Sequence, residues 1–131
     1  MIPKFRAYDG SLNRMYQTDE VMAGNGDIWI IDEDSVAGDW IVNNDINLMQ
    51  STGLFDKNGQ EIFEGDVVRQ VRTQPTTENE IVVGIVTMIE GAWLIMNDSE
   101  QLASYLWSET DTNEIIGNIY ENPELMEVDH G

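Results

Sequence analysis

The stretch from Gly53 to Val68 constrains the fold more than any other part of the chain, because turn signals and strand signals alternate within it. Asp56 to Gly59 is a cluster of turn residues, in which Gly59 is free to adopt a positive φ. Gly65–Asp66 predicts a second turn, and the β-branched pair Val67–Val68 favours a buried strand directly after it. Turns and strands spaced this closely are typical of an all-β fold.

Short apolar runs separated by turn residues continue along the rest of the chain. They predict strands at Lys4–Tyr8, Arg14–Tyr16, Ile28–Ile31, Trp40–Val42, Ile46–Met49, Ile62–Arg69, Ile81–Met88, Ala92–Met96 and Glu114–Ile119. Gly84, inside the longest apolar run, predicts a bulge or a bend. The polar segment Thr73–Glu80 predicts a loop. Ser99–Glu109 is the one segment whose pattern suits a helix, but Leu106–Trp107 fits a strand followed by a short helical turn equally well.

The predicted fold is therefore mainly β, with at most one short helix. We expect one domain over residues 1–131, in which a β-meander (residues 1–58) packs on a small SH3-like barrel (residues 59–122). Residues 123–131 are expected to form an acidic tail. Closure of the barrel would remove exposed sheet edges. A chain of 131 residues buries enough surface to fold without disulfides, which the absence of cysteine excludes.

The charge balance limits the partners of the chain. There are 25 acidic residues against 6 basic ones, which gives a formal net charge of −19, and no lysine or arginine follows Arg72. Such a surface repels nucleic-acid backbones and anionic membranes, so we expect no direct contact with either. The charge is explained either by solubility or by mimicry of a nucleic acid. The N-terminal residues predict neither a signal peptide nor a transmembrane helix.

Three blocks of sequence resemble the YopX family of phage and prophage proteins. They are Lys4–Asp9 with Met15–Tyr16, then Leu48–Arg69, and finally Ile115–Leu125. The resemblance implies a mainly β phage or prophage protein that acts in the cytoplasm of a bacterial host, and it brings no catalytic residues with it. Protein-specific function is expected in the stretches between the blocks, Glu20–Asp39 and Thr73–Asp111.

The densest group of carboxylates is Asp32, Glu33 and Asp34, followed closely by Asp39. Carboxylate oxygens suit Ca²⁺ or Mg²⁺, but the spacing does not match an EF-hand loop, so a solvated turn is the favoured interpretation. His130 is the only histidine and lies next to the C-terminal residue, where it is a poor general base. The sequence therefore predicts no catalytic residue, no metal site and no cofactor.

The Glu64–Asp66 segment and the four tryptophans have structural interpretations. Asp66 is expected to accept backbone N–H bonds in a tight turn. Trp29 and Trp93 lie in apolar strands and are expected to fill the core. Trp40 and Trp107 lie beside polar residues, so they are the aromatic candidates for contact with a partner.

The favoured function is a phage or prophage accessory protein that is not an enzyme. It would be an acidic module that binds a host or phage protein, or forms a homo-oligomer. The expected contact surface combines Trp40 and Trp107 with the acidic residues Asp32, Glu33 and Asp34. The first alternative is a nucleic-acid mimic that inhibits a basic host protein. A divalent-metal-dependent enzyme ranks last, because no Ser, His or Cys constellation is visible.

Overall fold

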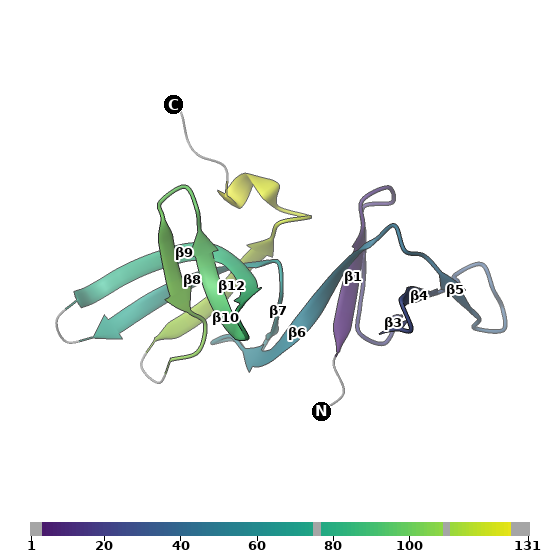
Figure 1. Ribbon diagram of the computed structural model, residues 1–131, viewed down its shortest axis with the longest axis horizontal. Coiled ribbons are helices and arrows are strands. Elements are labelled where there is room, and N and C mark those ends of the chain that lie inside the picture. The colour runs from purple at the N-terminus through teal and green to yellow at the C-terminus, as the bar shows by residue number, and fades with distance from the viewer. Residues whose placement is uncertain (1–3, 75–76, 109–110, 127–131) are drawn as a thin grey trace. The chain divides into compact units, whose positions relative to one another are not determined.

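The computed structural model describes residues 4–74, 77–108 and 111–126, with the backbone alone for 73–74 and 77–79. The chain divides into two compact units, Met1–Ser51 (unit 1) and Thr52–Gly131 (unit 2) (Figure 1). This boundary precedes the one that the sequence suggested between residues 58 and 59. The mainly β fold predicted from the sequence is confirmed.

Unit 1 contributes strands to two sheets, ordered β2-β1-β6-β7 and β3-β4-β5, of which β7 (Glu61–Phe63) belongs to unit 2. The strands are β1 (Phe5–Asp9), β2 (Arg14–Tyr16), β3 (Val21–Gly24), β4 (Asp27–Ile31), β5 (Trp40–Val42) and β6 (Asn47–Phe55), of which β6 continues into unit 2. The core of this unit consists of Ala7, Tyr16, Val21, Ile30 and Ile46. The predicted strands Lys4–Tyr8 and Arg14–Tyr16 correspond to β1 and β2, which pair as an antiparallel hairpin.

Strand β3 was not predicted from the sequence, because only one of its residues is an apolar residue that is buried in the core. Val21 is buried, whereas Met22, Ala23 and Gly24 are exposed. The strand exists because the Asn25–Gly26 turn returns the chain onto β4. Both turn residues have positive φ, 53° and 83°. That geometry matches the right-handed twist of a tight hairpin.

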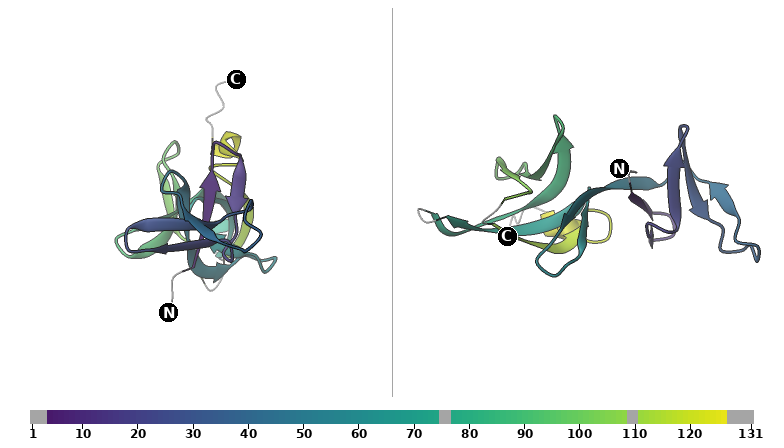
Figure 2. Two further views of the ribbon diagram at one scale, coloured as in Figure 1. Left: turned by 90° about the vertical axis from the view of Figure 1, so that its right-hand side faces the viewer. Right: turned by 90° about the horizontal axis from the view of Figure 1, so that it is seen from below.

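Unit 2 contains a curled five-stranded antiparallel sheet in the order β11-β10-β9-β8-β12 (Figures 1 and 2). The elements of unit 2 after β6 are β7 (Glu61–Phe63), β8 (Asp66–Gln74), β9 (Thr77–Ile89), β10 (Ala92–Asn97), β11 (Leu102–Tyr105), β12 (Thr112–Asn118) and the 3-10 helix η1 (Pro123–Met126). The curl is consistent with the small SH3-like barrel expected for this part of the chain.

Strand β9 changes partners along its length. Its residues up to Ile85 pair with β8, and Ile85 onward pairs with β10. Gly84 lies at this change, with no register shift beside it, so the bulge considered from the sequence is absent there. A Cβ atom on Gly84 would lie 2.6 Å from the carbonyl oxygen of Met96 on β10. Glycine is therefore required because the neighbouring backbone approaches too closely for a side chain.

The two edge strands of the sheet, β11 and β12, are linked through one buried side chain on β8. Gln70 is fully buried. Its Oε1 accepts a hydrogen bond of 2.6 Å from the Ser104 hydroxyl, and its Nε2 donates to the Tyr105 carbonyl at 3.0 Å. The same nitrogen donates to Asn113 Oδ1 on β12 at 3.0 Å, and Asn113 Nδ2 donates to the Leu106 carbonyl at 2.7 Å. These bonds hold the end of β11 against β8 and β12.

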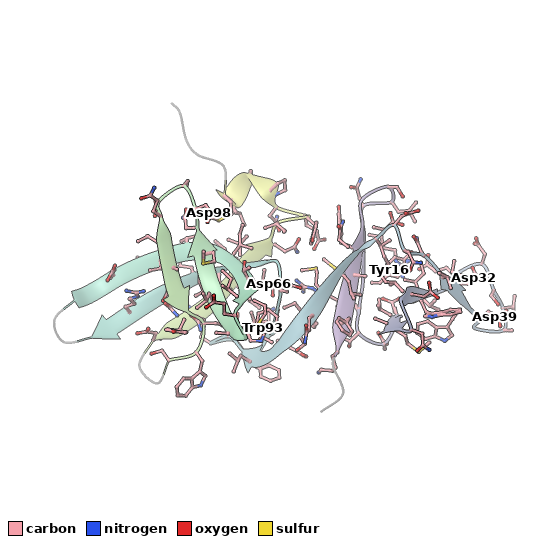
Figure 3. The ribbon with its side chains drawn as sticks, in the orientation of Figure 1. Tyr16, Asp32, Asp39, Asp66, Trp93 and Asp98 are labelled. Atoms are coloured by element: carbon pink, nitrogen blue, oxygen red, sulfur yellow. The ribbon has the colours of Figure 1, made fainter. Side chains whose placement is uncertain are left out.

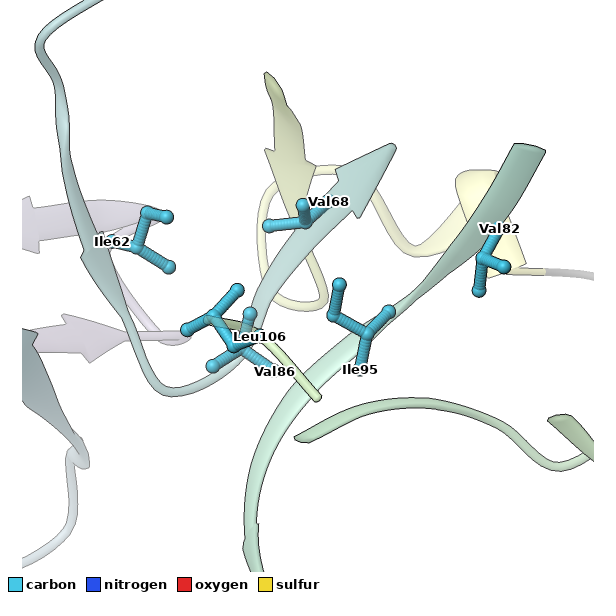
Figure 4. Close-up of a cluster of buried hydrophobic side chains, with 6 residues drawn as sticks. All are labelled: Ile62, Val68, Val82, Val86, Ile95 and Leu106. Carbon is cyan, nitrogen blue, oxygen red and sulfur yellow. The ribbon is translucent and has the colours of Figure 1, made fainter. Parts of the chain in front are cut away.

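The sheet curls around a core of branched aliphatic side chains (Figure 4). Its members are Ile62, Val68, Val82, Val86, Ile95 and Leu106, with Leu54, Trp93 and Ile115 packed against them. Each fully buried aliphatic side chain stabilises the fold by roughly 1.5–3 kcal/mol relative to exposure. Leu106 belongs to this core although it follows the last residue of β11.

Two predictions for unit 2 are wrong. Thr73–Glu80 is not a loop: β8 runs to Gln74 and β9 starts at Thr77, with residues 75–76 outside the described part. Cross-strand pairing lets polar residues extend a hairpin that an apolar pattern alone would end earlier. Ser99–Glu109 is not a helix, because Leu102–Tyr105 pairs with β10. Tertiary pairing overrides the helical spacing of Leu102, Tyr105 and Leu106.

The turns predicted around the Gly53–Val68 stretch are confirmed. Gly59 has a φ of 79°, and its N–H donates to the Asp56 carbonyl at 3.0 Å. Gly65 has a φ of 90°. Asp66 is buried, and its Oδ2 accepts the Phe63 N–H at 2.8 Å, as expected for a carboxylate that closes a tight turn.

The expected acidic tail is described only in part. Residues 123–126 form η1, while 127–131, which include His130, lie outside the described residues. Within the residues that are described, the structure has no helix long and apolar enough to cross a membrane.

We predict that Gln70→Leu lowers the free energy of unfolding of unit 2 by about 2–4 kcal/mol, because it leaves the buried Ser104 hydroxyl without its acceptor. Urea denaturation followed by tryptophan fluorescence measures the change. Gln60→Leu, at an exposed position, is the matched control. Equal stability of the two variants would show that the Gln70 hydrogen bonds do not hold the sheet together.

We predict that Gly84→Ala destabilises the fold by about 1–3 kcal/mol, because the added methyl group meets the backbone of β10. Gly10→Ala is the control, since a Cβ there meets nothing within 4 Å. Thermal unfolding of the two variants measures the difference. A Gly84→Ala midpoint at or above that of the unmodified protein would contradict the close approach.

Candidate functional site

The acidic cluster of unit 1 forms the loop between β4 and β5, where Figure 3 labels Asp32 and Asp39. Asp32 Oδ1 accepts the Asp34 N–H at 3.0 Å, and the Asp32 N–H donates to the Asp39 carbonyl at 2.9 Å. The Ser35 hydroxyl donates to Asp39 Oδ2 at 2.8 Å, and Glu33 forms an ion pair with Arg14. The cluster is thus a hydrogen-bonded turn, as favoured from the sequence.

No group of three or more acidic or histidine side chains within residues 4–74, 77–108 and 111–126 is arranged to hold a metal ion. Asp32 is half-buried, and Glu33 and Asp34 are exposed, so their charges lie at the surface.

The two tryptophans expected to contact a partner have different environments in different units. Trp40 is half-buried on β5, where it pairs in register with Ile31 of β4. Trp107 follows β11 in unit 2 and is 62% exposed. Trp107 is therefore the stronger candidate of the two, because little of its ring is used by the fold.

Trp107 belongs to a larger aromatic surface on unit 2. We define this aromatic surface by the residues that line two adjoining hollows or extend them: Leu54, Phe55, Ala92, Trp93, Tyr105 and Trp107. Tyr105 is 69% exposed and Phe55 is 60% exposed. Exposed aromatic side chains gathered in this way mark interaction surfaces in proteins.

The first hollow of the aromatic surface is apolar and has a volume of about 420 Å³. It is lined by Leu54, Ala92, Trp93, Tyr105 and Trp107. Trp93, on β10, is partly buried against the core, which agrees in part with its expected core position (Figure 3). Trp93 is therefore fixed by packing against the core, whereas the side chains of Tyr105 and Trp107 are largely exposed to solvent.

The second hollow is more polar and has a volume of about 310 Å³. It shares Leu54 and Trp107 with the first and adds, among others, Phe55, Asp56, Lys57 and Asp111. Lys57 Nζ lies 3.2 Å from Glu114 Oε2, so its charge is already compensated. The two hollows therefore differ in character: one is aromatic, and the other combines an aromatic wall with carboxylates.

The burial of Leu106 explains why the aromatic rings beside it face outward. Leu106 is fully buried in the core, and its N–H donates to the Trp93 carbonyl at 3.1 Å. Side chains alternate between the two faces of an extended backbone. With Leu106 turned inward, Tyr105 and Trp107 on either side of it are directed to the exterior.

Asp56 lines the second hollow and accepts three backbone hydrogen bonds. Its Oδ1 accepts the N–H groups of Asn58 and Gln60, both at 2.9 Å, and its Oδ2 accepts the Ile115 N–H at 3.1 Å. Burial alone would raise the pKa of this carboxyl group, but these hydrogen bonds and the charge of Lys57 outweigh it and hold the pKa below its ordinary value. Asp56 thereby joins the β6–β7 turn to β12 as a charged acceptor.

Trp29 is not a core residue, contrary to the sequence-based expectation. It is 36% exposed on β4 and pairs in register with Met22 on β3 and Val42 on β5. Residues in register across neighbouring strands share a face of the sheet. Met22 and Val42 are exposed as well, so this row lies on the outer face while Ile30 supplies the core.

Sequence reasoning did not select Tyr105 or Phe55 for the site. Tyr105 was placed on the apolar face of a helix that does not form. The structure shows the alternation of an extended backbone here: Ser104 and Leu106 are buried, whereas Tyr105 and Trp107 are exposed. Phe55 lay in the Gly53–Val68 stretch, which was interpreted as structural throughout.

The fold and the surface together define an all-β protein with a curled five-stranded sheet and an exposed aromatic surface. The family description "YopX protein" matches residues 4–127, so the chain belongs to the YopX family. This confirms the resemblance seen in the sequence. No match was found among curated proteins.

Two solved structures are similar over nearly the whole chain. Protein EF1440 from Enterococcus faecalis is 28% identical with a TM-score of 0.61, over 97% of this chain and 99% of that one. Protein yopX from Bacillus subtilis is 22% identical with a TM-score of 0.64, over 96% of this chain and 97% of that one. The second similarity is one of fold.

We predict that the stability contribution of the Asp56 carboxylate is lost in acid. Because its pKa in the folded protein is lower than the ordinary value of 3.8, the unfolded chain binds the proton more readily. The contribution is complete well above pH 3.8 and disappears as the pH falls through the lowered pKa. The difference in unfolding free energy between the unmodified protein and Asp56→Asn should therefore shrink with acidification.

Urea denaturation at a series of pH values from neutral to acidic measures this difference. Asp98→Asn, at an exposed position of the same unit, controls for the general loss of negative charge (Figure 3). A difference for Asp56→Asn that stays constant down to the lowest pH would contradict the lowered pKa.

Proposed function

We propose that this protein is a phage or prophage accessory protein that binds another protein and catalyses no reaction. It would act in the cytoplasm of the bacterial host. The observation that carries the proposal is the aromatic surface of unit 2, on which Phe55, Tyr105 and Trp107 are each at least 60% exposed. Tryptophan and tyrosine dominate the binding energy of protein interfaces, so solvent-exposed rings beside a hollow suit a partner.

The net charge supports a partner of opposite sign. The chain carries −19, and no lysine or arginine follows Arg72, so most of unit 2 contributes only negative charge. Complementary charge raises the rate of association and excludes partners of like sign. A basic host or phage protein therefore suits both features, with aromatic contacts supplying affinity and carboxylates supplying selectivity.

Self-association is a separate proposal for this protein. The exposed row of Met22, Trp29 and Val42 in unit 1 supplies an apolar face for it. Size-exclusion chromatography with light scattering at several concentrations decides between monomer and oligomer.

Mimicry of a nucleic acid is the second candidate function, and the charge of −19 is the observation that favours it. In such a mimic, carboxylates occupy the positions at which a basic host protein would bind the phosphates of a nucleic acid. Its binding would be dominated by charge and would weaken steeply with salt. Binding through the aromatic surface would instead persist, because added salt screens charges and leaves apolar contacts intact.

A divalent-metal-dependent enzyme remains the third proposal in rank. The Asp32–Asp34 turn is its only basis in the sequence. Replacement of Asp32 and Asp34 by Asn, followed by calorimetric titration with Ca²⁺ or Mg²⁺, tests it directly.

We predict that affinity capture from lysogenic or infected bacterial cells recovers a protein partner at both ~0.1 M and ~0.5 M salt, since the latter screens exposed charges. The partner should be lost when Tyr105→Ala and Trp107→Ala are combined. Leu12→Ala in unit 1, which also removes an exposed apolar side chain, is the control and should retain it. Capture that disappears at ~0.5 M salt but survives the double substitution would favour the nucleic-acid mimic instead.

A further inference from the structure

We propose that the outer face of the β3-β4-β5 sheet binds an amphipathic helix of another protein, one in which lysine or arginine flanks the apolar stripe. This inference goes beyond the proposed function, because it assigns a second interaction surface, in unit 1, that does not use the aromatic surface of unit 2. Three features support it: the apolar character of the face, the charge of the carboxylates around it and the backbone hydrogen bonding of a sheet.

The first feature is a row of apolar side chains that crosses all three strands (Figure 1). Met22, Trp29 and Val42 are in register on β3, β4 and β5, and each is at least 36% exposed. Because side chains alternate along a strand, Ile31 shares this face with Trp29, and Trp40 is in register with Ile31. The outer face therefore carries both tryptophans of unit 1 beside three aliphatic side chains.

The opposite face of the same sheet is already used by the fold. Val21 and Ile30, which are in register, belong to the core of unit 1 together with Ala7 and Tyr16. A sheet with one buried face normally turns polar side chains to the solvent on the other. Here the solvent face is apolar as well, and contiguous exposed apolar side chains mark interaction sites.

The second feature is the charge of this part of the chain. No lysine or arginine lies between Arg14 and Lys57, and Arg14 is paired with Glu20 and Glu33. Other carboxylates in this interval form no ion pair within residues 4–74, 77–108 and 111–126, namely Asp19, Asp27, Asp32, Asp34, Asp39 and Asp45.

Two of these carboxylates adjoin the apolar row. Asp27 lies two residues before Trp29 on β4 and so shares its face, and Asp39 directly precedes Trp40. Their side-chain hydrogen bonds come from neutral groups: Asp27 Oδ1 accepts Asn44 Nδ2 at 3.0 Å, and Asp39 Oδ2 accepts the Ser35 hydroxyl at 2.8 Å. Neutral donors leave the net charge of each carboxylate in place, so a cationic group on the ligand is favoured here.

The third feature is the backbone of the sheet. Strand β4 pairs with β3 on one side and with β5 on the other, so the outer face presents side chains to a ligand. A ligand lying on this face must satisfy its own backbone N–H and C=O groups. An α-helix does so internally, whereas a single extended segment does not. A helix packed on a sheet is also a standard pair of layers in proteins.

The charge distinguishes this occupant from a second copy of the chain. A second copy would bring the same carboxylates to the face and another −19 to the complex, so long-range repulsion opposes it. Nucleic acids and anionic membranes are repelled for the same reason. The ligand is therefore a cationic segment of a different protein.

The test uses synthetic peptides and the full chain. A fluorescein-labelled peptide of about 18 residues, roughly five helical turns, carries leucine at i, i+3, i+4 and i+7 spacing and lysine beside this stripe. A second peptide has the same composition in an order without helical periodicity, and a third has every lysine replaced by glutamate. Fluorescence anisotropy at ~0.1 M salt should show the first binding at least about tenfold more tightly than either of the others.

Variants of exposed residues locate the binding without disturbing the core. Met22→Gln combined with Val42→Thr makes the row polar and should weaken binding of the first peptide at least about tenfold. The matched control is Ile81→Thr combined with Met88→Gln, at exposed positions of unit 2, and it should leave binding unchanged. Circular dichroism of each variant checks that its fold is intact.

A second pair of variants tests the charge. Asp27→Asn combined with Asp39→Asn keeps an acceptor oxygen at each position and removes both charges. It should weaken binding at least about twofold and make binding less sensitive to salt. Asp98→Asn combined with Glu100→Gln removes two exposed charges from unit 2 and should have a smaller effect on both quantities.

Equal affinity for the periodic and the non-periodic peptide, or binding that survives the Met22 and Val42 substitutions, would overturn the proposal. Self-association of the protein that these two substitutions abolish would also overturn it, because a second copy would then occupy the face. The proposed function is decided by other residues. A cellular partner lost with the Tyr105 and Trp107 substitutions would sustain that function even where the helical peptide fails to bind.

Discussion

The buried amide of Gln70 is the interaction on which the architecture of unit 2 depends. One side chain on β8 satisfies the Ser104 hydroxyl and the Tyr105 carbonyl at the end of β11, and also Asn113 on β12. An antiparallel sheet of five strands has two edges with unpaired backbone groups. In this sheet the side-chain amides of Gln70 and Asn113 link the end of β11 to β8 and β12. They can do so because the curl of the sheet brings the two edge strands close enough for these hydrogen bonds.

The same closure sets the position of the aromatic surface. Once the Tyr105 and Leu106 carbonyls are bound by Gln70 and Asn113, the backbone at the end of β11 has little freedom. Leu106 fills the core, so the rings on either side must face solvent. Rigid presentation lowers the entropy that binding has to overcome, which favours recognition by a preformed surface. The buried amides of Gln70 and Asn113 thus fix the same backbone segment that carries the exposed rings of Tyr105 and Trp107.

The sequence predicted the features that depend on neighbouring residues and missed those that depend on distant ones. The turns at Gly59 and Gly65, the Asp66 acceptor and the strands at Ile81–Met88 and Ala92–Met96 follow from local chemistry, and the structure has all of them. The segment from Leu102 to Tyr105 became a strand because β10 offers it a free edge, which no local pattern reveals.

The same distinction explains the candidate site. Trp107 was selected from the polar residues beside it, and it is indeed exposed. Trp29 was assigned to the core from its apolar neighbours, but the register of β3, β4 and β5 places it on the outer face. The role of Gln70 could not be predicted, since a glutamine next to a predicted strand gives no sign that three distant groups will form hydrogen bonds with it. Side-chain networks of this kind are specified by the whole fold.

The high negative charge and the exposed aromatic rings are complementary properties. A surface with Phe55, Tyr105 and Trp107 in solvent would ordinarily favour association between copies of a protein. A net charge of −19 opposes that association at long range, where charge acts and apolar contact does not. A basic partner reverses the sign of this long-range term and gains the same aromatic contacts at short range. In the proposed function, charge would therefore select which molecule reaches the rings, and the rings would determine how tightly that molecule is held.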